Sequence, residues 1–178
     1  MSIQYRAALP RDAAEIHDIY QYYVDHTVAT FATVNPDEDE YRHKIESSLY
    51  PYWVAIADER VIGFAYAQQL RPKDAYLWDV ELTIYLHTDA PKGSGIGSQL
   101  YTILLEELTA LGFYNAYGVI TGSNQGSIRF HQRFGFAELA RFPKMGYKHG
   151  AWHDVVWMSK TLAPLSETPE LPKPFQKN

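Results

Sequence analysis

The pattern of apolar and polar positions in the first part of the chain predicts one strand and two helices. Residues 3–8 predict a short first strand. Asp12 and Glu15 then have the spacing of a capping box, in which each side chain binds a free backbone N–H at a helix start. Residues 27–36 mix β-branched, polar and aromatic residues and predict a loop, and residues 37–49 predict a polar, charged helix.

Strand patterns dominate the middle of the chain. Residues 53–57 and 61–68 are short apolar runs around the polar triplet 58–60, a pattern that predicts a β-hairpin. A further strand is predicted over residues 75–86.

Helices and strands alternate after that point. A glycine-rich loop over residues 91–97 leads into an amphipathic helix that ends at Gly112. The remaining predicted elements are a strand over 116–121, a short helix over 125–133 closed by Gly135, strands over 136–142 and 151–162, and a polar loop over 143–150 between those two strands.

The order of these elements predicts the fold class. A helical pair, a run of antiparallel strands and then alternating strands and helices indicate an α+β or mixed α/β domain, with a single central twisted, mostly antiparallel sheet flanked by helices. The domain is expected to cover residues 1–162. Residues 163–178 contain four prolines with polar spacers and are expected to form a loose tail.

Composition excludes several classes of function. The sequence contains no cysteine, which excludes disulfides, thiolate metal sites and a cysteine nucleophile. Its net charge is −5 and it has no basic stripe, so nucleic acid is not expected as a partner. No signal peptide and no apolar run near the ~20 residues of a membrane helix is seen, so we expect a cytoplasmic protein without membrane contact. Aromatic residues reach 15 %, which suits a core, an aromatic pocket or an interface.

The glycine-rich loop is the first candidate site. Glycines at positions 93, 95 and 97 stand between a predicted strand and a helix, where backbone N–H groups and the helix dipole bind a pyrophosphate, and Lys92 adds a charge. An ordinary glycine turn is the alternative. The spacing does not fit a Walker loop, because no lysine follows Gly97, and it fits the Gly-x-Gly-x-x-Gly dinucleotide fingerprint poorly.

Two motifs resemble the GNAT superfamily of N-acetyltransferases. The family pattern Arg/Gln-x-x-Gly-x-Gly/Ala matches Lys92-x-x-Gly95-x-Gly97, with lysine at its first position. The second motif is an asparagine that opens a helix ending in Gly-Phe, matched here by Asn124 and by Gly135-Phe136. A GNAT fold is therefore expected.

A narrower resemblance, to the phosphinothricin N-acetyltransferase family that includes methionine sulfone and methionine sulfoximine acetyltransferases, covers the chain up to about residue 162. Its matching segments include residues 63–67, 75–81 and 95–101, and the long segment 146–155 (Gly-Tyr-Lys-His-Gly-Ala-Trp-His-Asp-Val). The role of this last segment is not evident from the sequence. The family commonly forms homodimers, so a homodimer is expected.

The resemblance implies roles for individual residues. Acetyl-CoA is the implied cosubstrate, and its implied contacts are Ile84, Tyr85, Leu86, Lys92, Gly93, Ser94, Gly95, Ile96, Gly97 and Asn124. The implied walls of the pocket for a small amine substrate are Phe31, Arg71, Lys73, Tyr76 and Thr83. The family often has lysine where Arg71 stands and arginine where Lys73 stands, so both cations are present in exchanged order.

Two side chains are candidates for proton transfer. Glu81 lies in an apolar, aromatic strand, where partial desolvation raises the pKa of a carboxylate and improves it as a base, and it matches the family's general base. The alternative is a solvent-facing strand residue. His131 occupies the place of a tyrosine that serves many GNAT enzymes as an acid. Imidazole titrates near neutrality and suits either an acid or a second base, although a packed helix histidine is an equal alternative.

The predicted function is acetylation of the α-amine of a small amino-acid-like compound. Alternatives are acetylation of another amine (a polyamine, an aminoglycoside or a protein N-terminus) or a non-catalytic acetyl-CoA-binding module. No metal is expected, because the spacing of His149, His153 and Asp154 matches no standard zinc pattern.

Overall fold

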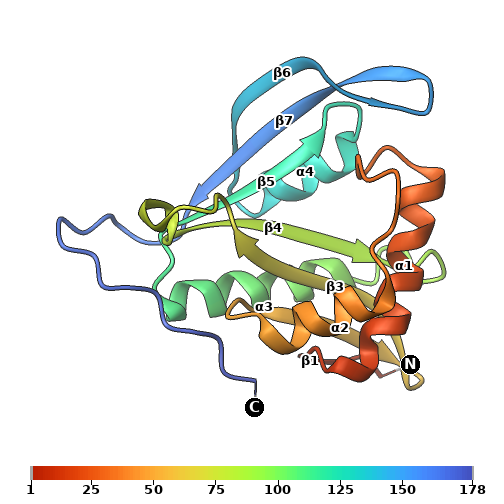
Figure 1. Cartoon of the computed structure of the whole chain (residues 1–178), viewed down its shortest axis with the longest axis horizontal. Coiled ribbons are helices and arrows are strands. Elements are labelled where there is room, and N and C mark those ends of the chain that lie inside the picture. The colour runs from red at the N-terminus through yellow and green to blue at the C-terminus, as the bar shows by residue number, and fades with distance from the viewer. Residues whose placement is uncertain (1, 178) are drawn as a thin grey trace.

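The computed structural model describes residues 2–177, which form one layered α/β unit (Figure 1). The strands are β1 (Gln4–Ala7), β2 (Tyr52–Ala57), β3 (Arg60–Gln69), β4 (Asp79–Leu86), β5 (Asn115–Thr121), β6 (Ala137–Lys148) and β7 (Ala151–Thr161). The helices are α1 (Ala13–His26), α2 (Glu38–Ser47), α3 (Ile96–Leu111) and α4 (Gln125–Arg133), with short 3₁₀ turns at Pro10–Asp12 and Asp74–Tyr76.

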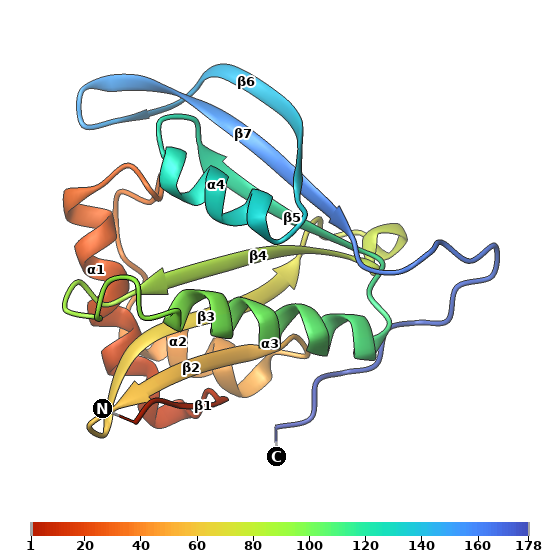
Figure 2. The same ribbon diagram turned by 180° about the vertical axis from the view of Figure 1, so that it is seen from behind.

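Over these residues the strands form one sheet in the order β1-β2-β3-β4-β5-β7-β6. Neighbouring strands are antiparallel except β4 and β5, which run parallel and pair only over three residues, Asp79–Glu81 against Asn115–Tyr117. Beyond this short pairing the two strands separate (Figures 1 and 2). The expected mixed, mostly antiparallel sheet flanked by helices is confirmed.

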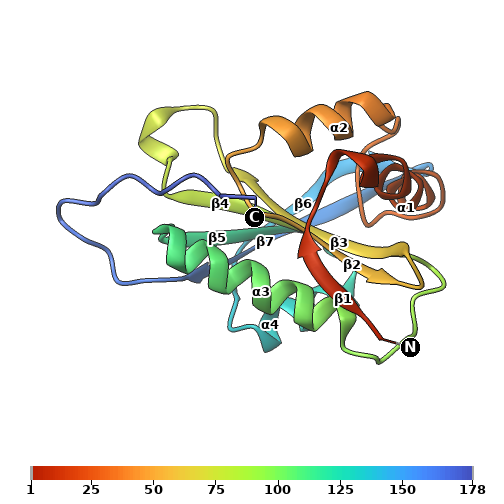
Figure 3. The same cartoon turned by 90° about the horizontal axis from the view of Figure 1, so that it is seen from below.

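Helices cover both faces of the sheet, with α1 and α2 on one side and α3 and α4 on the other (Figure 3). Strand periodicity creates the two cores, because alternate side chains point to opposite faces. In β2 and β3, Val54 and Phe64 belong to the core under α1 and α2, whereas Ala55 and Ala65 belong to the core under α3.

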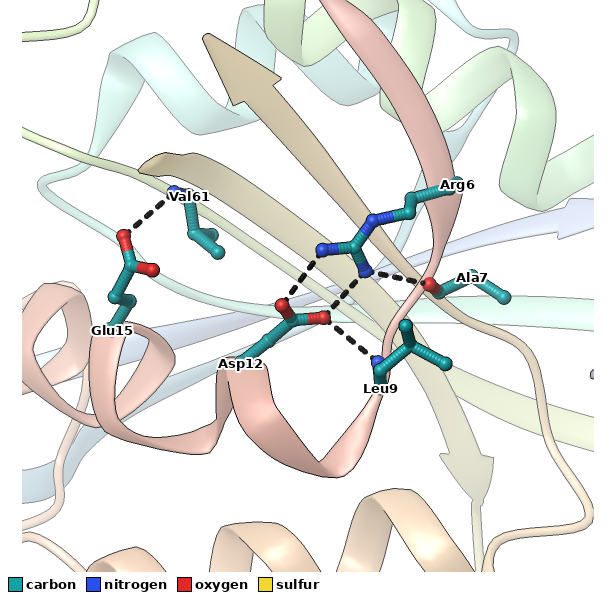
Figure 4. Close-up of polar contacts among 6 residues, drawn as sticks. All are labelled: Arg6, Ala7, Leu9, Asp12, Glu15 and Val61. Carbon is teal, nitrogen blue, oxygen red and sulfur yellow. Dashed lines mark hydrogen bonds and ion pairs between the residues drawn. The ribbon is translucent and has the colours of Figure 1, made fainter. Parts of the chain in front are cut away.

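A bidentate ion pair anchors the N-terminus of α1 (Figure 4). The buried carboxylate of Asp12 accepts hydrogen bonds from the Arg6 guanidinium at 2.6 and 2.8 Å and from the Leu9 backbone N–H at 2.8 Å. Glu15 instead accepts from the backbone N–H of Val61 at 2.8 Å. The predicted capping box between Asp12 and Glu15 is therefore wrong, because Asp12 binds Arg6 of β1 and the N–H of Leu9 ahead of the 3₁₀ turn, and Glu15 binds Val61 of β3.

Two predicted boundaries are also wrong. The strand expected over 75–86 begins only at Asp79, because residues 74–76 form a 3₁₀ turn. The polar loop expected over 143–150 is strand up to Lys148, with a shift in register between Phe142 and Gly146, so that only His149 and Gly150 turn the chain.

Residues 163–177 contain neither helix nor strand, as expected, but they are not loose. The Phe175 ring is buried near Trp53. The backbone N–H of Phe175 donates to the Leu49 carbonyl at 2.9 Å. The backbone carbonyl of Glu170 accepts a hydrogen bond from the Trp78 indole at 2.7 Å. Residues 163–177 therefore contact the surface of the domain through Glu170 and Phe175.

Candidate active site

The separation of β4 from β5 opens a cavity of about 570 Å³. Its walls come from β4 from Glu81 onward, from β3, from the end of β5, from α4, and from α1 with the loop that follows it. β4 contributes Glu81, Leu82, Thr83, Ile84, Tyr85 and Leu86, and β5 contributes Gly118, Val119, Ile120 and Thr121. Because β4 and β5 are hydrogen-bonded only up to Glu81 and Tyr117, the backbone edge of β4 faces this cavity.

The glycine loop forms a second hollow of about 500 Å³ that shares Tyr23, Leu86, Gly97 and Phe130 with the first. Gly93 and Gly95 have φ angles of +73° and +80°, in the left-handed region that favours glycine. Gly95 directly precedes α3, whose first N–H groups lack intrahelical partners and attract anions. The residues expected to bind pyrophosphate all line this hollow: Lys92, Gly93, Ser94, Gly95, Ile96 and Gly97.

Glu81 lines the main cavity from β4. Partial burial raises the pKa of its carboxyl group. A hydrogen bond from Gln68 and the charges of Arg71 and Lys44 lower it, with a smaller combined effect. Gln68 lies directly opposite Glu81 on β3 and also lines the cavity. A carboxyl group with a raised pKa that faces a cavity is suited to accept a proton.

His131 is 4 % exposed and lines the same cavity from α4. Its Nδ1 lies 2.8 Å from the carbonyl oxygen of Ser127, and a carbonyl only accepts, so Nδ1–H donates and Nε2 keeps a lone pair. Burial lowers the pKa of His131, so the neutral ring is favoured. A Cβ at Gly118 would lie 2.7 Å from Nε2, so only glycine at this position leaves room for the ring.

Aromatic residues from α1, β3 and β4 form part of the cavity wall. Tyr20, Tyr23, Tyr66 and Tyr85 line the cavity, while Tyr52 and Tyr101 are buried in the two cores. The Tyr23 hydroxyl donates to the Leu86 carbonyl at 2.8 Å, which fixes α1 against the cavity end of β4. Aromatic residues therefore serve both as core and as cavity wall, two alternatives that the composition left open.

The segment 146–155 holds the loop after α1, which carries Thr30 and Phe31. Lys148, 5 % exposed, donates to the Thr30 carbonyl at 2.9 Å, and the His149 ring donates to the Thr27 carbonyl at 3.2 Å. A Cβ at Gly146 would lie 2.6 Å from the Phe31 ring, so that ring lies directly against the hairpin backbone. Residues 146–155 therefore hold in place the loop after α1, which forms one wall of the cavity.

The structure distributes the sequence-predicted residues unevenly. Those that line the main cavity are Phe31, Glu81, Thr83, Ile84, Tyr85, Leu86, Gly97, Asn124 and His131. Asn124 caps α4 by accepting from the Ser127 N–H at 3.1 Å. Arg71, Lys73 and Tyr76 are exposed in the segment between β3 and β4 and do not line it. The guanidinium carbon of Arg71 lies 5.4 Å from the Trp157 ring centroid.

Sequence reasoning missed several residues near the site, namely Lys44, Tyr66, Gln68, Arg133 and Lys148. Arg133 lines the hollow at the glycine loop and is a second cation there. Its position at the end of the helix after Asn124 was a usable signal. Lys44 comes from a distant part of the chain and carries no local signal, whereas Lys148 lies in the segment 146–155 that matches the narrower family.

His153 and Asp154 have structural partners. The His153 ring donates to the Lys148 carbonyl at 3.1 Å, and Asp154 accepts from the Lys144 N–H at 3.0 Å. Within residues 2–177, no group of three or more histidine or acidic residues is placed to hold a metal ion. In the same residues, no helix has the length and apolar character needed to cross a bilayer.

The fold and this site place the chain in a known class of enzyme. The chain belongs to the GNAT family of N-acetyltransferases, since the acetyltransferase (GNAT) domain family matches residues 5–157. The resemblance noted from the glycine and asparagine motifs is thereby confirmed.

Individual relatives narrow the comparison. The chain is 33 % identical over 176 residues to a phosphinothricin N-acetyltransferase of Streptomyces viridochromogenes, covering 98 % of this chain and 93 % of that one. It is 32 % identical over 160 residues to an L-methionine sulfoximine/L-methionine sulfone acetyltransferase of Salmonella typhimurium, covering 88 % and 93 %. The crystal structure of a phosphinothricin acetyltransferase from Sinorhizobium meliloti in complex with AcCoA matches with a TM-score of 0.87 and 36 % identity, over 99 % of this chain and 95 % of that one.

Proposed function

We propose that this protein transfers an acetyl group directly from acetyl-CoA to the α-amine of a small amino-acid-like substrate of the phosphinothricin, methionine sulfone or methionine sulfoximine type. One observation carries the proposal: β4 leaves β5 just beyond Glu81, so a carboxylate meets an open backbone edge inside a cavity that continues to the glycine hollow. The names of the similar proteins support the substrate class, and the AcCoA complex of the Sinorhizobium structure supports the cosubstrate.

The residues present fit acetyl-CoA. The glycine hollow offers free N–H groups at the start of α3, and nothing lies within 4 Å of where a Cβ of Gly93 or Gly95 would stand. Lys92 and Arg133 add positive charge for a pyrophosphate. The edge of β4 at Ile84, Tyr85 and Leu86 would hold the pantetheine arm, and Asn124 would lie toward the thioester end. Acetyl-CoA would supply an activated acetyl group and leave as a thiol.

The protein's own groups supply the proton chemistry. An ammonium has no lone pair, so Glu81 accepts a proton from the substrate amine, directly or through water. His131, neutral and with Nε2 available, serves as a second base or, once protonated, as the acid for the departing thiolate. Backbone N–H groups of β4 beyond Glu81 would polarise the thioester carbonyl.

The substrate's acidic group would lie near Arg71 and Lys73, with Phe31, Tyr76 and Thr83 shaping the pocket. Phe31 and Thr83 already line the cavity, and Arg71 is close enough to Glu81 to lower its pKa. An arginine can bind a carboxylate or phosphinate through two hydrogen bonds.

We also propose a homodimer and a cytoplasmic location. The β6–β7 hairpin exposes several large apolar side chains that suit an interface: Leu139, Phe142, Met145, Tyr147 and Trp152. Equilibrium sedimentation is expected to give twice the chain mass, and a monomer at micromolar concentration would contradict the dimer. Use of acetyl-CoA agrees with a cytoplasmic location, which cell fractionation would test.

A thiol-release assay with acetyl-CoA and a panel of amines tests the function. We expect turnover with L-methionine sulfone, L-methionine sulfoximine or phosphinothricin, and little with spermidine, an aminoglycoside or a peptide N-terminus. Turnover only with a cationic amine would replace the substrate class. Calorimetric binding of acetyl-CoA without release of thiol for any acceptor would identify a non-catalytic binding module.

A further inference from the structure

Lys44 on α2 lies behind the wall of the cavity, beside residues that form it. Its Nζ atom is 3.8 Å from the centroid of the Tyr66 ring and donates a hydrogen bond to Oε1 of Gln68 at 3.1 Å. Tyr66 and Gln68 both line the cavity, whereas Lys44 itself does not. An aromatic face and an amide oxygen both favour a cation at this position. The contact joins helix α2 to strand β3.

The contact with Lys44 fixes the orientation of the Gln68 amide. A lysine ammonium can only donate, so the oxygen of Gln68 is committed to Lys44 and the NH₂ group is left to point elsewhere. Glu81 is the cross-strand partner of Gln68, and directly opposed side chains lie on the same face of a sheet with Cβ atoms about 5 Å apart. The free NH₂ group therefore has the Glu81 carboxylate as its natural acceptor.

We propose that Lys44 is a positioning residue for the general base: it holds the Gln68 amide with its NH₂ group toward Glu81 and places a positive charge beside that carboxylate. The inference rests on the proposed function, in which Glu81 accepts the proton of the amine. Lys44 acts through Gln68 and through its charge, and it touches neither substrate nor cosubstrate.

The groups around the Glu81 carboxylate agree with this role. Lys44 faces it from α2, Gln68 and Tyr66 from β3, and Arg71 from the segment after β3, while Tyr117 on β5 is its register partner and His131 lines the same cavity. Burial raises the pKa of Glu81, and Gln68, Arg71 and Lys44 lower it. Burial also lowers the pKa of Lys44 to about 8, so its charge is largely kept at neutral pH and is lost above pH 8.

Loss of Lys44 should therefore make Glu81 harder to deprotonate. In the Lys44→Met variant the acid limb of the kcat/KM profile for L-methionine sulfone moves to higher pH, so that kcat/KM at pH 6 falls by about three- to tenfold, with a smaller loss at pH 8. Lys44→Arg keeps the positive charge and is expected to retain most of the kcat/KM that Lys44→Met loses at pH 6. Arg42→Met is the matched control, because Arg42 is a cation of the same helix that pairs with Glu38 and Asp39 instead.

Carboxyl-¹³C NMR of glutamate-labelled protein, with the Glu81 signal assigned by its absence from Glu81→Gln, follows the same titration without turnover. Glu81 is expected to titrate at higher pH in Lys44→Met than in the wild-type protein or in Arg42→Met. Titration at the same pH in all three would overturn the inference, and so would an equal shift in Arg42→Met.

The two proposals fail in different ways. A Glu81→Gln variant that keeps both its activity and the acid limb would show that Glu81 is not the base, which contradicts the proposed function. If Glu81→Gln loses the limb but Lys44→Met does not move it, only the role of Lys44 is overturned. A Gln68→Met, Lys44→Met double variant is expected to shift the limb by less than the sum of the single variants, because both act on one carboxylate.

Discussion

Asp12 and Glu81 are two carboxylates of the same domain with opposite surroundings. Asp12 is 4 % exposed and accepts two hydrogen bonds from Arg6 and one from the Leu9 backbone, so its oxygens have fixed partners (Figure 4). Glu81 faces an open cavity, and burial that is only partly offset by Gln68, Arg71 and Lys44 raises its pKa. The oxygens of Asp12 are occupied by hydrogen bonds within the protein, whereas the carboxylate of Glu81 can still accept a hydrogen bond or a proton from a ligand in the cavity.

The difference separates a structural carboxylate from a reactive one. A buried carboxylate with a guanidinium and a backbone N–H fixes the join between β1 and α1, and removing it exposes an unpaired charge. A carboxylate beside a cavity, with a raised pKa, can take a proton from a ligand without breaking the fold. The first should therefore matter for stability and the second for rate.

The largest expected effect is that of Glu81→Gln on catalysis. We expect kcat/KM for L-methionine sulfone to fall by roughly 10²- to 10⁴-fold, the usual contribution of a positioned base. Binding of acetyl-CoA, measured by calorimetry, is expected to be unchanged. Activity within threefold of the wild type would refute the assignment of the base.

The same variant also tests stability against pH. Because the pKa of Glu81 is raised in the folded state, its contribution to stability is complete below the pKa of the unfolded chain and is lost as pH rises through the folded value. Glu81→Gln removes this loss, so its Tm is expected to equal that of the wild type near pH 4 and to exceed it by about 1–4 °C at pH 8. A lower Tm at pH 8 would show that Glu81 stabilises the fold as Asp12 does.

Asp12→Ala should show the reverse pattern. Removing one partner of this ion pair is expected to lower the free energy of unfolding by about 2–4 kcal/mol, because Arg6 and the Leu9 N–H lose their acceptor. Urea unfolding measures the change. The kcat/KM of the folded variant, assayed at low temperature, is expected to stay within twofold of the wild type, and a hundredfold loss would place Asp12 in the catalytic apparatus.

Gly118→Ala tests the position of His131 with a smaller effect. The new Cβ would lie 2.7 Å from Nε2, so the ring must move, and kcat is expected to fall by about tenfold because a displaced group is a poorer acid or base. In a His131→Ala background the Gly118→Ala substitution is expected to change kcat little. An equal loss in both backgrounds would show that it acts through β5 and not through the imidazole.

Local patterns predicted the parts of the site that one segment of chain builds alone. The glycine loop depends on residues within a few positions of each other, so their spacing predicted it, and the family resemblance placed Asn124 at the start of a helix. The predicted loop over 143–150 failed because this stretch of the β6–β7 hairpin is largely exposed and lacks the alternating burial by which a strand is recognised.

Contacts between distant segments could not be predicted in this way. Lys44 meets Gln68 across 24 residues, and Lys148 meets Thr30 across 118. Both are lysines, for which a solvated surface position is the ordinary expectation. Their burial is decided by how α2 and the β6–β7 hairpin lie against the rest of the domain.

Lys148→Met applies the same comparison, between a structural and a reactive charged group, to two lysines. Its expected effect on catalysis is the smallest of those predicted. Like Asp12, and unlike Lys44, Lys148 has fixed backbone partners: it donates to the carbonyls of Thr30 and Tyr23 at 2.9 and 3.5 Å. Its loss should free the loop that carries Phe31, and we expect KM for the acceptor to rise by about two- to fivefold while kcat and the acid limb of the pH profile stay unchanged.

Lys144→Met is the matched control for this variant, because Lys144 is an exposed lysine of the same hairpin. Initial rates across a range of acceptor concentrations separate KM from kcat. A shift of the acid limb in Lys148→Met would mean that this lysine changes the pKa of Glu81, as Lys44 is proposed to do. The distinction between a lysine that holds a loop and a lysine that tunes the base would then fail. An unchanged limb with a raised KM would locate the tuning of the base on the α2 side of the cavity.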